Sequence, residues 1–297
     1  MLITNKIPVG LLLSKTKYEL LAIISYAVAI GILDHHSHLE EITLPLAIPT
    51  LLGTALSLLL AFRINQSYDR WWEARIVWGT IVNDSRTLIR QVNTFIVDEN
   101  SSTSVAFAKR QVAWCYALGE SLRKLPFSEK VKQYAEDYKS HANIPNALLL
   151  KHSEKVRKIY LDGQLNHFQQ IQIDSTIARL CDSMGKCERI KNTVFPGNYS
   201  MLLHFLIYIF ATLLPLGLGD YSVLMEVVLT TIFAAIFLLI ERTAIFMQDP
   251  FENMPTDTPV TALANTVEAN ANGRVRTTKV CTCYSLLSTL KIYQHNR

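Results

Sequence analysis

The stretch that decides the fold runs from residue 61 to residue 79 and reads AFRINQSYDRWWEARIVWG. A long apolar run, Leu44 to Phe62, ends inside it, and charged residues follow at helical spacing. Tyr68 and Trp72 are four residues apart, so they share one face of a continuing helix. Aromatic and arginine side chains at the end of an apolar run are typical of a membrane–water interface. The stretch predicts one long helix that leaves a membrane here, and a buried soluble helix with an amphipathic extension is the alternative.

The composition favours an integral membrane protein with a water-soluble part. Of the 297 residues, 49% are hydrophobic and 18% are charged, against about 25% charged in soluble globular proteins. The net charge of +4 forms no basic stripe or tail, so nucleic acid is not suggested as a partner. The five cysteines form neither an even disulfide framework nor two CxxC pairs, which favours free thiols in a reducing cytosol over zinc.

Four apolar segments are long enough to be considered as membrane spans, at 20–33, 44–62, 201–218 and 223–240. A span needs about 20 apolar residues, so the first segment is short, although it extends to Tyr18. Pro49 and Pro215 interrupt the second and third segments. Such breaks are tolerated where neighbouring helices or water satisfy the freed carbonyls.

The loops orient these spans. Lysine and arginine lie before the first span, after the second, before the third and after the fourth, whereas the loops at 34–41 and 219–221 contain neither. Because inside loops carry the excess of basic residues, both termini are predicted to be cytoplasmic, in a cell inner (plasma) membrane. The predicted organisation is a cytoplasmic N-terminal segment 1–17, two spans in 18–63, a helical cytoplasmic domain 64–199, two spans in 200–246 and a cytoplasmic C-terminal segment 247–297.

The region between the second and third spans predicts helices and almost no sheet, because no run alternates with period two. Helical periodicity covers 105–122, and further helices are expected over 129–138, 147–160 and 164–190. A short helix over 261–268 is expected to pack on this domain. The predicted fold class is therefore an all-α membrane protein with four transmembrane helices per subunit and a large helical cytoplasmic domain.

The stretch at 61–79 resembles the signature of bacterial bestrophins at the end of their second membrane helix. A second match, QDPFEN at 248–253, resembles the family's segment after its last membrane helix. The resemblance implies a homopentameric ion channel in which that second helix lines a central pore. Its implied partners are copies of itself, the lipid bilayer and monovalent ions, and no cofactor is expected. Animal relatives pass chloride and bacterial relatives need not, so the sign of the ion stays open.

Alignment on residues 70–72 places the family's three neck residues on Thr54, Leu58 and Phe62. These residues are spaced by four and drift only about 80° around a helix, so they form one stripe. Several copies around an axis would give a narrow, mostly apolar throat, and hydrophobic constrictions gate by dewetting. Thr54 departs from the bulky apolar residue usual at the outer ring. Ordinary helix packing is the alternative for the same stripe.

The resemblance also implies a cytoplasmic pore mouth and a structural junction. The mouth falls at Phe168 and Ile171. At the junction, the segment after the last span is expected to dock by salt bridges onto the helix that carries two arginines of the opening stretch. The junction residues are Arg70, Trp71, Trp72, Arg75, Asp249, Pro250 and Phe251.

The loop at 34–41 is the only constellation typical of an enzyme or a metal site, with His35, His36 and His38 among carboxylates. Neutral imidazole suits Zn, Cu or Ni, but a short exposed loop offers no second shell, so a solvated loop is favoured. No GxSxG, HExxH or P-loop motif occurs, and we predict that the protein is not an enzyme. Two alternatives stay open: a membrane-anchored metal-binding protein or enzyme that uses this loop, and a secondary transporter, which usually shows repeated halves.

Overall fold

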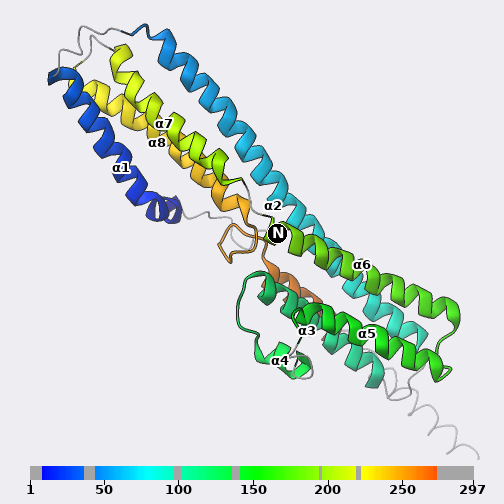
Figure 1. Ribbon diagram of the computed structural model, residues 1–297. Helices are drawn as coiled ribbons and strands as arrows, with labels where there is room; N and C mark the ends of the chain where they lie inside the picture. Colours follow the sequence, from blue (N-terminus) through cyan, green and yellow to red (C-terminus); the bar gives the residue numbers. More distant parts are fainter. Residues whose placement is uncertain are drawn as a thin grey trace, which may run out of the picture.

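Two helical bundles lie end to end along one long helix (Figure 1). The computed structural model describes residues 9–36, 44–96, 102–135, 141–193, 196–218 and 222–272, and it contains no strand among them. The first bundle contains α1 (Val9–His36), the first half of α2 (Ala47–Phe95), α7 (Gly197–Leu218) and α8 (Val223–Gln248). The second contains the other half of α2, α3 (Ser102–Leu122), α4 (Glu129–Ala135), α5 (Ile144–Leu161) and α6 (His167–Asn192). The predicted all-α fold is confirmed.

The first bundle has the character of a membrane domain. Its four helices are each long and apolar enough to cross a membrane. They share a buried core that includes Leu56, Leu60 and Ile207, while large apolar side chains such as Leu21 and Leu224 are exposed on the outside. A helix that is apolar on both its packed and its outer face suits a lipid surrounding.

The first helix is longer than the sequence predicted. The apolar segment at 20–33 was expected to be the span, but α1 begins at Val9 and takes in Lys15 and Lys17. Its 28 residues extend about 42 Å at 1.5 Å per residue, which exceeds the hydrocarbon core of about 30 Å. Hydropathy therefore located the part of this helix that suits the hydrocarbon and missed its polar end.

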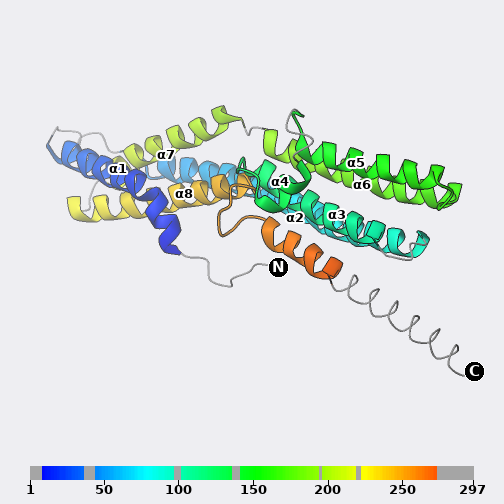
Figure 2. The same cartoon turned by 90° about the horizontal axis from the view of Figure 1, so that it is seen from below.

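The second bundle has its own core, built around Trp78, Phe107 and Trp114. The helices predicted over 105–122, 147–160 and 164–190 are confirmed, and so is the helix predicted over 129–138 as far as Ala135, since 136–138 lie outside the described residues. In the C-terminal tail, residues 260–272 form a helix that packs on α3 (Figure 2). The Tyr116 hydroxyl on α3 donates to Glu268 Oε2 at 2.7 Å. The expected packing of the tail helix on this bundle is confirmed.

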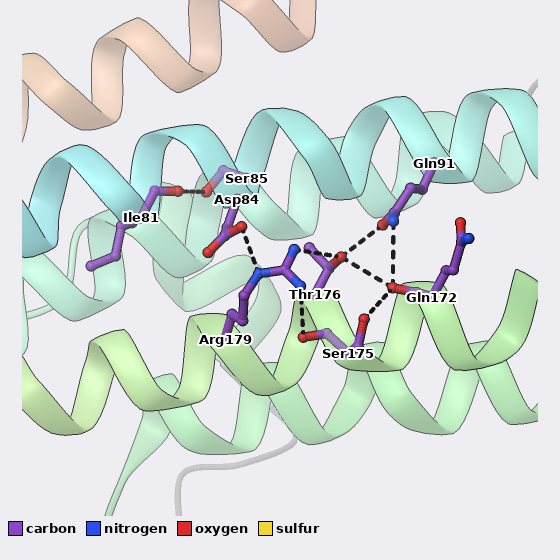
Figure 3. A network of polar contacts seen from close by, with 8 residues as sticks. All are labelled: Ile81, Asp84, Ser85, Gln91, Gln172, Ser175, Thr176 and Arg179. Carbon is purple, nitrogen blue, oxygen red and sulfur yellow. Dashed lines mark hydrogen bonds and ion pairs between the residues drawn. The ribbon is translucent and has the colours of Figure 1, made fainter.

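A polar seam holds α6 antiparallel to α2 in the second bundle (Figure 3). Arg179 Nε lies 3.0 Å from Asp84 Oδ1, and the Thr176 hydroxyl donates to Gln91 Oε1 at 2.9 Å. Gln91 Nε2 also donates to the carbonyl of Gln172 at 3.4 Å. These contacts fix the register of the two helices, so the start of α6 lies beside the end of α2.

Candidate functional site

One face of α2 is uncovered along the first bundle. Leu58 is 58% exposed and Phe62 is 54% exposed, and Thr54 is exposed on the same face. On the opposite face Leu56 and Leu60 are buried in the core. No element among the described residues covers the three predicted neck side chains, so packing within one chain does not explain the apolar character of Leu58 and Phe62.

The same uncovered stripe continues into the second bundle. Its members recur at spacings of three, four or seven, which keeps them on one side of a helix. Tertiary contacts from α6, α7 and α8 cover the other sides of α2. The exposed members of the stripe are Leu51, Thr54, Leu58, Phe62, Asn65, Asp69, Ile76, Thr80 and Asn83.

Two further apolar side chains are exposed at the far end of the second bundle. Phe168 is 79% exposed and Ile171 is 52% exposed, both in the first turn or two of α6. A capping box between Asn166 and Gln169 fixes where this helix begins. The seam between α2 and α6 places these residues near the end of α2, as Figure 1 shows for the two helices.

The segment after α8 inserts an aromatic anchor into the second bundle. Phe251 is fully buried in the same core as Trp78, and Pro250 beside it is buried. The Phe251 backbone N–H donates to Asp249 Oδ1 at 3.1 Å, and this bond holds the turn at the end of α8. The Trp71 indole N–H on α2 donates to the carbonyl of Thr256 at 2.9 Å, so this segment docks on α2.

The expected salt bridge between Asp249 and Arg70 or Arg75 is not formed among the described residues, although Asp249 attracts the Arg70 guanidinium. Asp249 Oδ2 lies 2.5 Å from Lys191 Nζ on α6. Arg70 instead donates to the carbonyls of Ile190 and Thr193, because the last turn of a helix leaves carbonyls that need donors. Arg75 has no hydrogen bond or ion pair with any described residue.

Trp72, the remaining junction residue, is 47% exposed. Its ring stacks on Tyr68 with the ring centroids 6.4 Å apart. It therefore belongs to the outer surface of α2, and the junction itself is built by Trp71 on the neighbouring face.

Sequence reasoning missed a buried polar cluster at the inner end of the first bundle. Arg63 is 1% exposed and donates to Gln248 Oε1 at 2.7 Å and to the Ser200 hydroxyl at 3.1 Å. Glu241 is fully buried, attracts the Arg63 guanidinium and lies 3.0 Å from His204 Nε2. The available signal was an ionisable residue at the end of an apolar run, which marks a functional or structural centre in a membrane.

The histidine loop lies mostly outside the described residues. His35 is exposed on the last turn of α1, whereas His38 and the side chain of His36 are outside the described part. No group of three or more metal-binding side chains occurs among the residues that the structure describes.

A known protein family matches most of this chain. The sequence model described as "Bacterial/Fungal Bestrophin protein" matches residues 7–273, and this confirms the resemblance drawn from the two motifs. The chain belongs to the bestrophin family.

Several relatives match this chain over most of their own length. The "Voltage-dependent anion channel-forming protein YneE" of Escherichia coli is 32% identical over 265 residues, which cover 87% of this chain and 86% of the relative. A Ralstonia nicotianae protein named in the same way is 31% identical over 248 residues, covering 78% and 79%. A crystal structure of a bacterial bestrophin homologue from Klebsiella pneumoniae superposes with a TM-score of 0.78 at 26% identity, covering 87% and 98%.

One carboxyl group at the bestrophin junction gives a pH prediction. Burial raises the pKa of Asp257 from its ordinary 3.8 to about 6, although the Met254 N–H donates to its Oδ2 at 2.9 Å and opposes the shift. Because the folded protein holds this proton more tightly, the stability from this group is fully present below about pH 4 and is lost as the pH rises through about 6.

The substitution Asp257→Asn removes this dependence. Asparagine keeps an oxygen that accepts from the Met254 N–H and does not ionise. We expect the melting temperature of the variant, minus that of the wild type, to be higher at pH 7.5 than at pH 4.5. The measurement is thermal unfolding in detergent at both pH values, and an equal difference at both would contradict the assignment.

Proposed function

We propose that this chain is the subunit of a homopentameric channel that conducts small monovalent ions passively through a pore lined by α2. The observation that carries the proposal is the uncovered stripe on a helix whose opposite face is packed, with Leu58 and Phe62 more than half exposed. In a cyclic oligomer the same face of each subunit repeats around the axis. The names of the Escherichia coli and Ralstonia relatives as channel-forming proteins support the same activity.

The apolar part of the stripe forms the neck of this pore. Leu58 and Phe62 supply rings of aliphatic and aromatic side chains that gate by dewetting. Thr54 makes the outer ring smaller in side-chain volume and more polar than the other two. Phe168 and Ile171 form a second narrowing at the cytoplasmic mouth, beside the end of α2.

The channel lies in the inner (plasma) membrane with both termini in the cytoplasm. The basic residues at the inner loops and the apolar outer faces of α1, α7 and α8 support this orientation. The membrane part comprises 18–63 and 200–246. The cytoplasmic parts comprise 1–17, 64–199 and 247–297.

Reconstitution into lipid vesicles tests the channel. We expect purified protein to pass monovalent ions down a salt gradient, with a flux that neither saturates nor depends on a second solute. Replacing Leu58 by phenylalanine adds volume to the neck and is expected to lower unitary conductance several-fold. Saturable, coupled transport would overturn the proposal.

The matched control is Leu21→Phe on α1. Leu21 is 58% exposed, the same fraction as Leu58, but it lies on another helix and off the α2 stripe. We expect its conductance to equal that of the wild type. Equal conductance in Leu58→Phe and Leu21→Phe would move the constriction away from α2, and light scattering of both variants checks that the oligomer persists.

A further inference from the structure

The uncovered stripe of α2 carries an ionised side chain just beyond the neck. Asp69 is exposed and lies seven residues after Phe62, which is two helical turns and about 10 Å along the axis. Asn65 and Thr80, the nearest polar members of the stripe on either side, are uncharged. The first charged side chain on the stripe beyond the neck is therefore a carboxylate.

The other two carboxylates of α2 are neutralised by cations. Glu73 Oε1 lies 2.6 Å from Arg189 Nη2, and Asp84 Oδ1 lies 3.0 Å from Arg179 Nε (Figure 3). Asp69, in contrast, forms no hydrogen bond or ion pair with any residue that the structure describes. The Asp69 carboxylate is thus exposed on the stripe without an ion-pair partner among the described residues.

No basic side chain lies on the stripe near the neck. Arg63 is buried, and helix geometry places Arg70 about 100° and Arg75 about 120° around α2 from Asp69. Arg70 donates to two carbonyls at the end of α6. Arg90 is exposed but lies about 30 Å further along the helix. That separation is about three Debye lengths at 0.1 M salt, so its field at the neck is screened.

We propose that Asp69 determines the sign of the permeant ion by forming a ring of carboxylates, one per subunit, that favours monovalent cations. The inference rests on the proposed pore and names the substrate class of that pore. Rings of aspartate or glutamate select cations in channels, and about 10 Å is within one Debye length of the neck at 0.1 M salt. The apolar neck has no charge of its own to oppose this preference.

Reversal potentials across a KCl gradient test the ring. We expect the wild type to prefer potassium over chloride, Asp69→Asn to reduce that permeability ratio at least three-fold, and Asp69→Lys to shift it toward chloride. The effect also depends on ionic strength: between about 0.02 M and about 0.5 M KCl the Debye length shortens about five-fold. The conductance difference between wild type and Asp69→Asn is therefore expected to be large at low salt and small at high salt, which a merely structural role would not produce.

The matched control is Glu154→Gln, which removes the same charge from α5. Glu154 is exposed and only weakly paired, with its Oε2 3.5 Å from Lys151 Nζ. We expect the ion selectivity of the Glu154→Gln channel to equal that of the wild type. A wild type that prefers chloride overturns the inference, and so does an unchanged ratio in Asp69→Asn when Leu58→Phe still alters conductance. If neither Asp69→Asn nor Leu58→Phe changes the currents, the pore along α2 itself is overturned.

Discussion

Replacing Arg63 by methionine is expected to lower the free energy of unfolding by about 3 to 5 kcal/mol and to prevent assembly. The loss combines two hydrogen bonds from a charged donor, to Gln248 and Ser200, each worth about 1.5 to 3 kcal/mol. Glu241 adds to the loss, because it is fully buried and would keep its contact with His204 but lose the nearby guanidinium that it attracts. Gln248 and Ser200 would also lose the donor that ties α2 to α8 and α7.

The double variant Arg63→Met with Glu241→Leu separates this explanation from a simple loss of packing. Removing both charges leaves neither of them buried without the other, so we expect the double variant to lose less stability than the sum of the two single losses. Thermal unfolding and oligomer mass in detergent are the measurements. Additive losses in the double variant would mean that the two charges do not compensate each other.

Arg90→Met is the control for this cycle. Arg90 lies on the same helix and carries the same charge, but it is exposed. Surface substitutions usually change stability by less than about 0.5 kcal/mol. A loss in Arg90→Met as large as that in Arg63→Met would show that α2 tolerates no loss of arginine, buried or exposed.

The course of α2 was predictable because local physics determines it. Between Leu51 and Phe95 the only glycines are Gly53 and Gly79 and there is no proline, so no strong helix breaker separates the apolar part from the charged part. The spacing of three and four residues also predicted the exposed stripe, since a helix places such residues on one face. The neck alignment itself came from family resemblance.

The contacts across helices were not predictable from one sequence. Asp249 and Arg70 both lie at the junction, but the choice of Lys191 as the ion partner depends on where the end of α6 lies. Arg70 donates to the last carbonyls of that helix instead. Likewise Arg63 and Gln248 are 185 residues apart in the chain, and only the packing of α8 on α2 brings them together.

The second large effect is expected at Phe251, the aromatic anchor after α8. Its side chain is fully buried in the core of the second bundle, and truncating a buried phenylalanine to alanine costs about 3 to 5 kcal/mol. We expect Phe251→Ala to unfold at a markedly lower temperature and to release the segment that Trp71 binds. Phe251→Leu, which keeps most of the apolar volume, is expected to lose less than about 1.5 kcal/mol.

Phe168→Ala is the same substitution at an exposed position. Phe168 is 79% exposed, so its truncation is expected to change stability by less than about 0.5 kcal/mol. At the proposed cytoplasmic mouth it would instead alter unitary conductance, which Phe251→Ala would affect only through loss of folded protein. Conductance and melting temperature, measured on both variants, therefore distinguish a residue that holds the second bundle together from one that faces the ion. Equal melting temperatures in the two variants would contradict the anchoring role of Phe251.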